Sequence, residues 1–325
     1  MPAAAMLERH PASDSMPATT GQVMAISPNM RGALFMSLSM AGFTFNDAII
    51  KVLAGDLNIG QLMFLRGVIA SVLIFLLARH RRALRPVRYL VDKWVALRVL
   101  GELGGTLTFL VGLARIPIAE ASAILQALPL AVTMGAALFL GEPVGWRRWA
   151  AILAGFAGIL IIVRPGFEGF SPYALMIVGT VIFATVRDIS TRKVHPSIPS
   201  LFLSTVTAVA VALAGFVLIW PMGGWQPVSV PELGLISLAA LLLLIGYQFI
   251  IMSLREGEIS FVAPFRYTSL LWALLLGMLV FGEYPDVYML AGSAIVIGSG
   301  LYTLYRERIK STDKPASHAP PRHSP

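Results

Sequence analysis

The chain has 325 residues, of which 57% are hydrophobic and only 13% are charged, and its mean hydropathy is +0.77. These values exclude an ordinary soluble globular domain and indicate a polypeptide that crosses a membrane several times. The net charge of +8 fits basic cytoplasmic loops better than nucleic-acid binding, and the absence of cysteine excludes disulfides and thiolate metal sites.

The two ends of the chain differ in composition from the rest. Residues 1–30 are polar, contain Pro, Ser and Thr, and lack the apolar core of a signal peptide. The other end, residues 307–325, is also polar and rich in Pro. We expect both segments to be disordered cytoplasmic tails.

Between the tails lie apolar stretches with about the length, roughly 20 residues, that a helix needs to cross a bilayer. Short connections that contain Gly, Pro or Asp separate them. In the first half we predict helices over Gly32–Leu53, Gln61–Leu77, Trp94–Leu113, Ile118–Leu140 and Trp149–Val163. In the second half we predict helices over Tyr173–Ser190, Leu201–Trp220, Leu233–Leu254, Ile259–Phe281 and Val287–Tyr305.

The two halves repeat one another. A shift of 141 residues brings the sequence into register with itself from about residue 34 to residue 301, without a gap. An offset this constant indicates that a unit of five helices was duplicated, giving repeats over residues 31–165 and 172–306. The matched positions include Gly141-Glu142 with Gly282-Glu283, Asp47 with Asp188, and Lys51 with Arg192.

Because each repeat has an odd number of crossings, the second copy must enter the membrane from the opposite side. Of the 25 Lys and Arg residues, nineteen lie in tails and loops on the side of the N-terminus, and three lie in loops on the other side. Basic loops stay in the cytoplasm, so both termini are expected there. The predicted fold is all-α and integral to a bacterial cytoplasmic (inner) membrane, with ten transmembrane helices in two inverted five-helix repeats. Such repeats are typical of secondary transporters.

The sequence around the fourth helix of each repeat resembles a known family. Pro129 precedes Phe139-Leu140-Gly141-Glu142, and the second copy ends in Phe281-Gly282-Glu283. These motifs resemble the drug/metabolite transporter superfamily with tandem EamA domains. Phe45-Asn46-Asp47 and Ala263-Pro264-Phe265-Arg266-Tyr267 resemble its branch of riboflavin and S-adenosylmethionine importers. The resemblance implies a cavity lined by the third, fourth, eighth and ninth helices.

Charged side chains inside the bilayer cost roughly 2.5–3.5 kcal/mol each at its centre and usually persist because they are paired or used. Arg266 has no acid four residues away and is followed by aromatic side chains, and Gln126 is aligned with Tyr267 by the repeat. Arg266 could instead pair with an acid on another helix, and Gln126 could bond the carbonyl that Pro129 frees. The predicted substrate-cavity residues are Glu102, Gln126, Tyr247, Gln248, Arg266, Tyr267 and Trp272.

Other charges suit structural or gating pairs within one helix. Opposite charges four residues apart share a helix face, which relates Asp47 to Lys51, Asp188 to Arg192, and Arg98 to Glu102. The last of these pairs fits a structural lock as well as a substrate or proton site. We interpret Glu142 and Glu283 as structural residues at helix ends.

The predicted function is uptake of a small organic metabolite by alternating access, with riboflavin the leading substrate because aromatic rings accompany Arg266 and Gln126. The alternatives are uptake of S-adenosylmethionine, export of amino acids or drugs, or a lipid flippase subunit. The five His lie in tails or loops and no acid dyad occurs in a helix, so we expect no enzyme, metal or cofactor. The expected partners are the metabolite and membrane lipid, not nucleic acid, and the oligomeric state stays open.

Overall fold

The computed structural model describes residues 27–86 and 92–312, so most of both predicted tails lies outside the described residues. Residues 307–312 continue the last helix, so the second tail begins later than the sequence predicted. Within the described residues, ten helical crossings are long and apolar enough to span a membrane, as predicted.

Eight of these crossings are unbroken helices. They are α1 (Pro28–Leu53), α2 (Ile59–His80), α3 (Lys93–Leu113), α6 (Trp146–Val163), α7 (Pro172–Lys193), α8 (Ser200–Ile219), α9 (Val230–Glu256) and α12 (Val287–Thr312).

The fourth crossing of each repeat is interrupted, although the sequence predicted one helix in each place. In the first repeat, α4 (Ile118–Leu125) and α5 (Leu128–Phe139) meet at a break. In the second, α10 (Ile259–Val262), the 3-10 helix η2 (Ala263–Tyr267) and α11 (Thr268–Phe281) follow one another. Pro129 and Pro264 each stand in the first turn of a new segment, where the missing N–H leaves no bond unmade.

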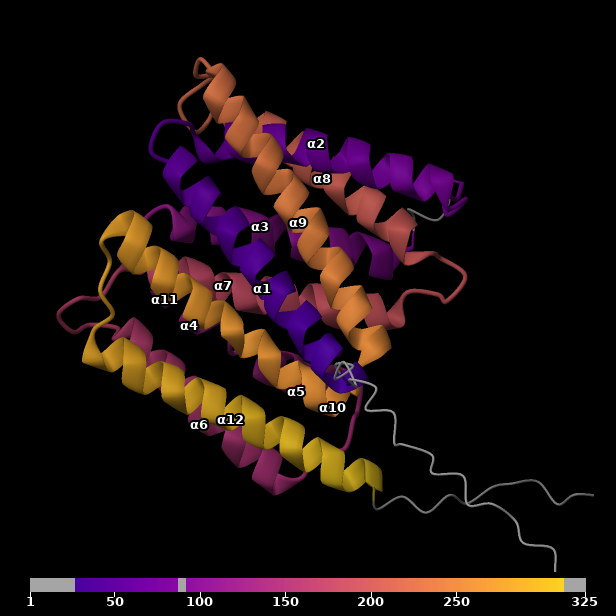
Figure 1. The fold of residues 1–325 in the computed structure, drawn as a ribbon, viewed down its shortest axis with the longest axis vertical. Helices are drawn as coiled ribbons and strands as arrows, with labels where there is room; N and C mark the ends of the chain where they lie inside the picture. The colour runs from indigo at the N-terminus through magenta and orange to yellow at the C-terminus, as the bar shows by residue number, and fades with distance from the viewer. Residues whose placement is uncertain (1–26, 87–91, 313–325) are drawn as a thin grey trace, which may run out of the picture.

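The helices pack in pairs that join one repeat to the other: α1 with α9, α2 with α8, α3 with α7, and α6 with α12 (Figure 1). The Ser39 hydroxyl on α1 donates to the carbonyl of Gly246 on α9 at 2.7 Å. Closer to the start of α1, Ser253 on α9 donates to the carbonyl of Gly32 at 2.6 Å. The two helices are therefore antiparallel.

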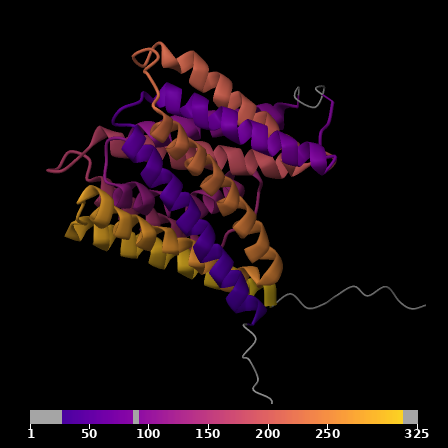
Figure 2. The same ribbon diagram turned by 45° about the horizontal axis from the view of Figure 1, so that its top comes forward.

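This pairing establishes that the repeats are inverted. Consecutive crossings alternate in direction, so the first and third crossings of one repeat run the same way. The third crossing of the second repeat is α9, and it runs antiparallel to α1. The first crossing of that repeat, α7, runs in the same direction as α9 and is therefore also antiparallel to α1. The start of α1 and the end of α12 accordingly lie at the same end of the molecule (Figure 2).

A left-handed glycine ends the interrupted crossing in both repeats. Gly141 has φ +69° and Gly282 has φ +65°, a conformation that costs glycine little and other residues more. The following N–H groups turn back onto the helix: Glu142 donates to Ala136 at 3.3 Å and Glu283 donates to Gly277 at 2.9 Å. The Gly-Glu motif thus turns the chain so that a carboxylate stands at the helix end.

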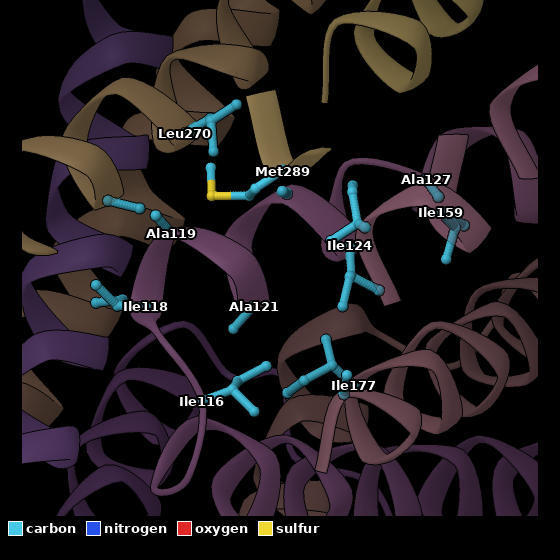
Figure 3. Close-up of a cluster of buried hydrophobic side chains, with 14 of the residues drawn as sticks. Ile116, Ile118, Ala119, Ala121, Ile124, Ala127, Ile159, Ile177, Leu270 and Met289 are labelled. Atoms are coloured by element: carbon cyan, nitrogen blue, oxygen red, sulfur yellow. The ribbon is translucent and has the colours of Figure 1, made fainter. Parts of the chain in front are cut away.

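The largest apolar core surrounds α4, where it packs against α6, α7, α11 and α12. Ile116, Ile118 and Ile124 are at most 2% exposed, and Ile177, Leu270 and Met289 reach them from other helices (Figure 3). This cluster fills one end of the space between the repeats.

Candidate functional site

A cavity of about 660 Å³ lies between the two repeats. Its walls come from α1, α3, α4, α5, α7, η2, α11 and α12. No described residue of the eighth crossing, α9, lines this cavity, although the resemblance implied that it would. The first and sixth crossings, α1 and α7, line the cavity instead.

The cavity is closed at one end and open at the other. Leu113, Ile118 and Ala121 line it and are at most 2% exposed, so they form a sealed floor. At the opposite end, Thr191 and Arg192 line it and are exposed, with 51% of the Arg192 side chain accessible. We call these two regions the floor and the mouth.

The lining carries charges of both signs as well as neutral polar groups. Its polar members are Thr44, Asp47, Arg98, Ser122, Gln126, Thr133, Asp188, Thr191, Arg192, Arg266, Tyr267 and Ser269. Phe43 and Phe109 add aromatic surface. No group of three or more His, Cys, Asp or Glu side chains in residues 27–86 and 92–312 could hold a metal ion.

The two breaks in the fourth crossings meet in this cavity. Gln126, at the break after α4, donates its side-chain amide to the Ser269 hydroxyl near the start of α11 at 2.7 Å. The amide is thus bonded across the two repeats rather than to the carbonyl freed by Pro129. Discontinuous helices that meet near the membrane midplane commonly form transporter binding sites.

Arg266 and Tyr267 belong to η2 and face this junction differently. Arg266 is exposed, and it has no ion pair within the part of the chain that the structure describes. Tyr267 is 8% exposed, and its hydroxyl lies against Gly300 of α12, where any side chain would overlap it. That hydroxyl has no hydrogen-bond partner among the described residues. Because Arg266 is exposed and has no ion pair among the described residues, its guanidinium is available to a ligand.

The remaining predicted cavity residues lie outside the lining. Glu102 pairs with Arg187 of α7 at 3.3 Å. The ring of Tyr247 packs edge-on against the lining residue Phe43, with centroids 5.1 Å apart. Two other predicted cavity residues, Gln248 and Trp272, likewise do not line the cavity.

None of the predicted pairs within single helices forms an ion pair among the described residues, and their basic members have partners on other elements instead. Lys51 pairs with Glu283 at 2.8 Å, and Arg192 pairs with Glu142 at 2.8 Å. Asp47 accepts a hydrogen bond from the neighbouring Asn46, and Asp188 accepts one from the neighbouring Arg187. Arg98 donates to the hydroxyl of Thr191 on α7.

Two kinds of functional residue escaped the sequence interpretation. Asp47 and Asp188, assigned there to charge pairs, line the cavity. Glu142 and Glu283, assigned to helix ends, are partners in ion pairs between the repeats. The offset of 141 residues was a signal for the two ion pairs, because it relates Glu142 to Glu283 and Lys51 to Arg192.

Comparisons with known proteins agree with this architecture. The model of the EamA-like transporter family matches residues 30–164 and again residues 171–305. A solved crystal structure of 19% sequence identity superposes with a TM-score of 0.58, covering 86% of this chain and 98% of the other, and supports the fold alone.

Several bacterial relatives are transporters by name. The chain is 27% identical to an S-adenosylmethionine uptake transporter of Rickettsia conorii, over 87% of this chain and 96% of the relative. It is 31% identical to a riboflavin transporter of Vibrio cholerae, over 71% of this chain and 76% of the relative. It is 28% identical to a pseudopaline exporter of Pseudomonas aeruginosa, over 79% and 91%. With both repeats matched by the family model, this multi-pass integral membrane protein belongs to the EamA-like transporter family.

Proposed function

We propose that the protein is a secondary transporter that takes up a small zwitterionic metabolite, with S-adenosylmethionine as the leading candidate. The carrying observation is the mixed charge of the cavity, where Asp47 and Asp188 stand with Arg98 and Arg266. S-adenosylmethionine has a sulfonium, an ammonium, a carboxylate and a planar base. Each of these groups has a chemical counterpart in the lining, and charged ligand groups that leave water need such counterparts. Relatives that bear this activity in their names cover most of the chain.

Riboflavin, the leading substrate from the sequence, is the second candidate. Phe43, Phe109 and Gln126 line the cavity and suit a planar ring that accepts and donates hydrogen bonds. The riboflavin transporter of Vibrio cholerae supports this alternative. It ranks second because riboflavin offers no cation to Asp47 and Asp188.

A lipid flippase is the least favoured of these alternatives. A second cavity, of about 750 Å³, lies between α3, α5, α6 and α7 and is lined by apolar side chains such as Leu138, Phe139 and Leu160. No charged side chain of the described residues lines it, so a lipid head group would find no ion-pair partner among them.

We further propose that both termini are cytoplasmic and that the mouth faces the cytoplasm. The basic residues support this orientation: Arg147, Arg148 and Arg306 lie at the same end as Arg192, while the floor end has fewer basic loop residues. In this orientation the structure is an inward-open state of the carrier.

Uptake of labelled S-adenosylmethionine tests the proposal. The full chain is expressed in a bacterial host that does not take up this compound, and saturable accumulation in intact cells is expected. Asp47→Asn and Asp188→Asn are each expected to lower uptake about tenfold, the size of a lost charge-assisted contact. The matched control is Asp56→Asn, because Asp56 is exposed in the loop after α1.

Riboflavin is tested in parallel. A riboflavin auxotroph without its own importer receives the same chain, and growth is measured at limiting vitamin. Growth together with no accumulation of S-adenosylmethionine would support the second candidate. Failure of both assays, with the protein shown to be in the membrane, would overturn uptake of either compound.

A further inference from the structure

Two ion pairs at opposite ends of the cavity are related by the repeat. Lys51, near the end of α1, pairs with Glu283, after α11, at 2.8 Å. Arg192, near the end of α7, pairs with Glu142, after α5, at 2.8 Å. The offset of 141 residues converts Lys51 into Arg192 and Glu142 into Glu283. The inverted symmetry therefore exchanges one pair for the other.

The pair at the floor is mostly buried and has further bonds. The Lys51 and Glu283 side chains are 11% and 21% exposed. The Lys51 ammonium also donates to the carbonyl of Ile116, and the Glu283 carboxylate accepts the N–H of Ile118 at 2.9 Å. These backbone groups flank the start of α4, so the pair holds three segments together and seals the floor.

The pair at the mouth is exposed and lacks those additional bonds. The Arg192 and Glu142 side chains are each 51% exposed. The offset relates the two floor backbone groups to Gly257 and Ile259, at the start of α10. Within the described residues, neither Arg192 nor Glu142 bonds to them, and Ile259 is 66% exposed. The same arrangement is thus complete at the floor and incomplete at the mouth.

We propose that the two pairs are the alternating gates of the carrier. In the opposite state, Glu142 would accept the N–H of Ile259 and Arg192 would donate to the carbonyl of Gly257, while Lys51 and Glu283 would release α4. This inference rests on the proposed transport function but not on the identity of the substrate. It follows because an inverted repeat offers the same packing at either end.

The floor also has an ion pair without a counterpart. Arg164 pairs with Asp286 at 2.5 Å, and the offset relates these residues to Tyr305 and Gly145, which cannot form an ion pair. The Arg164–Asp286 pair therefore adds to the closure of the floor in a way that the matched positions at the mouth cannot reproduce.

The absence of cysteine makes a direct test possible. Ser122→Cys places one thiol in the cavity, and oriented membrane vesicles expose one end of the carrier at a time to a membrane-impermeant thiol reagent. Faster labelling is expected from the mouth side. Adding Glu283→Gln is expected to raise labelling from the floor side on the order of tenfold, as when a partly buried ion pair is broken.

Glu142→Gln is the matched control at the mouth. It removes the same charge from the exposed pair, so labelling from the floor side should not rise and labelling from the mouth side should change less than about twofold. Should Glu283→Gln not accumulate in the membrane, Asp286→Asn tests the same gate and should shift labelling in the same direction, but less. The double exchange Lys51→Glu with Glu283→Lys restores the ion pair but not the two backbone bonds, so it should reverse the rise in labelling only in part.

Labelling needs no ligand, so its outcome tests the gate proposal independently of the proposed substrate. Unchanged floor-side labelling in both Glu283→Gln and Asp286→Asn overturns the gate, even where uptake is normal. An equal rise in Glu142→Gln overturns it too, because the pairs would then only hold helix ends. A shift as expected, with no uptake of either compound, supports the gate and refutes only the substrate assignment.

Discussion

The fourth crossings of the two repeats are both interrupted, yet the side chains around the two interruptions differ. In the first repeat, Ala123 and Ile124 are fully buried beside the floor. In the second, the matching positions are Pro264 and Phe265, in a 3-10 helix that is only partly buried. The next matched pair is Leu125 and Arg266.

This difference shows how a symmetric scaffold acquires one specific site. Both copies are interrupted and both carry a proline in the first turn of a new segment, although the offset matches Pro129 with Leu270 and Pro264 with Ala123. The side chains diverged, so that one interruption packs the floor and the other presents a guanidinium to the cavity. The following predictions test this division of roles.

The largest effect is expected at Arg266. Arg266→Ala should lower uptake by about tenfold or more, because it removes the cation at the interrupted crossing. Uptake per amount of membrane-inserted protein is the measurement. Arg266→Lys should keep part of the activity, since it retains the charge but not the planar fork. Normal uptake by the alanine variant would mean that η2 does not bind the substrate.

The largest effect on stability, as distinct from uptake, is expected in the first repeat. Ile124→Ala should lower the free energy of unfolding by about 2–5 kcal/mol, because it opens a hole in the core around α4. Phe265→Ala, at the matching position, should lower it by less than about half as much, since Phe265 is only partly buried. Denaturant titration in detergent measures both, and equal losses would contradict the assigned roles.

The smallest effect is expected where the two interruptions touch. Gln126→Ala should lower the free energy of unfolding by about 0.5–1.5 kcal/mol, the usual net value of one hydrogen bond. Ser269→Ala should act similarly. The double variant should cost little more than either single one, and strict additivity would show that the bond does not join the repeats.

Much of the fold could be predicted because it depends on local quantities. The apolar stretches have the length of a bilayer crossing, and the constant offset revealed the duplication. The sequence did not predict the breaks after Leu125 and Val262, since a proline in the first turn of a segment and a proline that bends a continuous helix look alike in sequence.

The site could be predicted only in part. Gln126, Arg266 and Tyr267 were identifiable as polar or aromatic residues within apolar crossings, and all three line the cavity. Glu102 was equally conspicuous, but it pairs with Arg187. A polar residue inside a crossing is recognisable, whereas its partner depends on which helix lies beside it.

By itself, the sequence determined that this protein has ten crossings in two inverted repeats, because chain direction follows from the number of apolar stretches and their order. Only the tertiary structure decided which charges meet. Lys51 has an acid one helical turn away, yet its partner is Glu283 of the other repeat. Side chains at helix ends reach across the space between helices, and that space is defined by packing rather than by spacing along the chain.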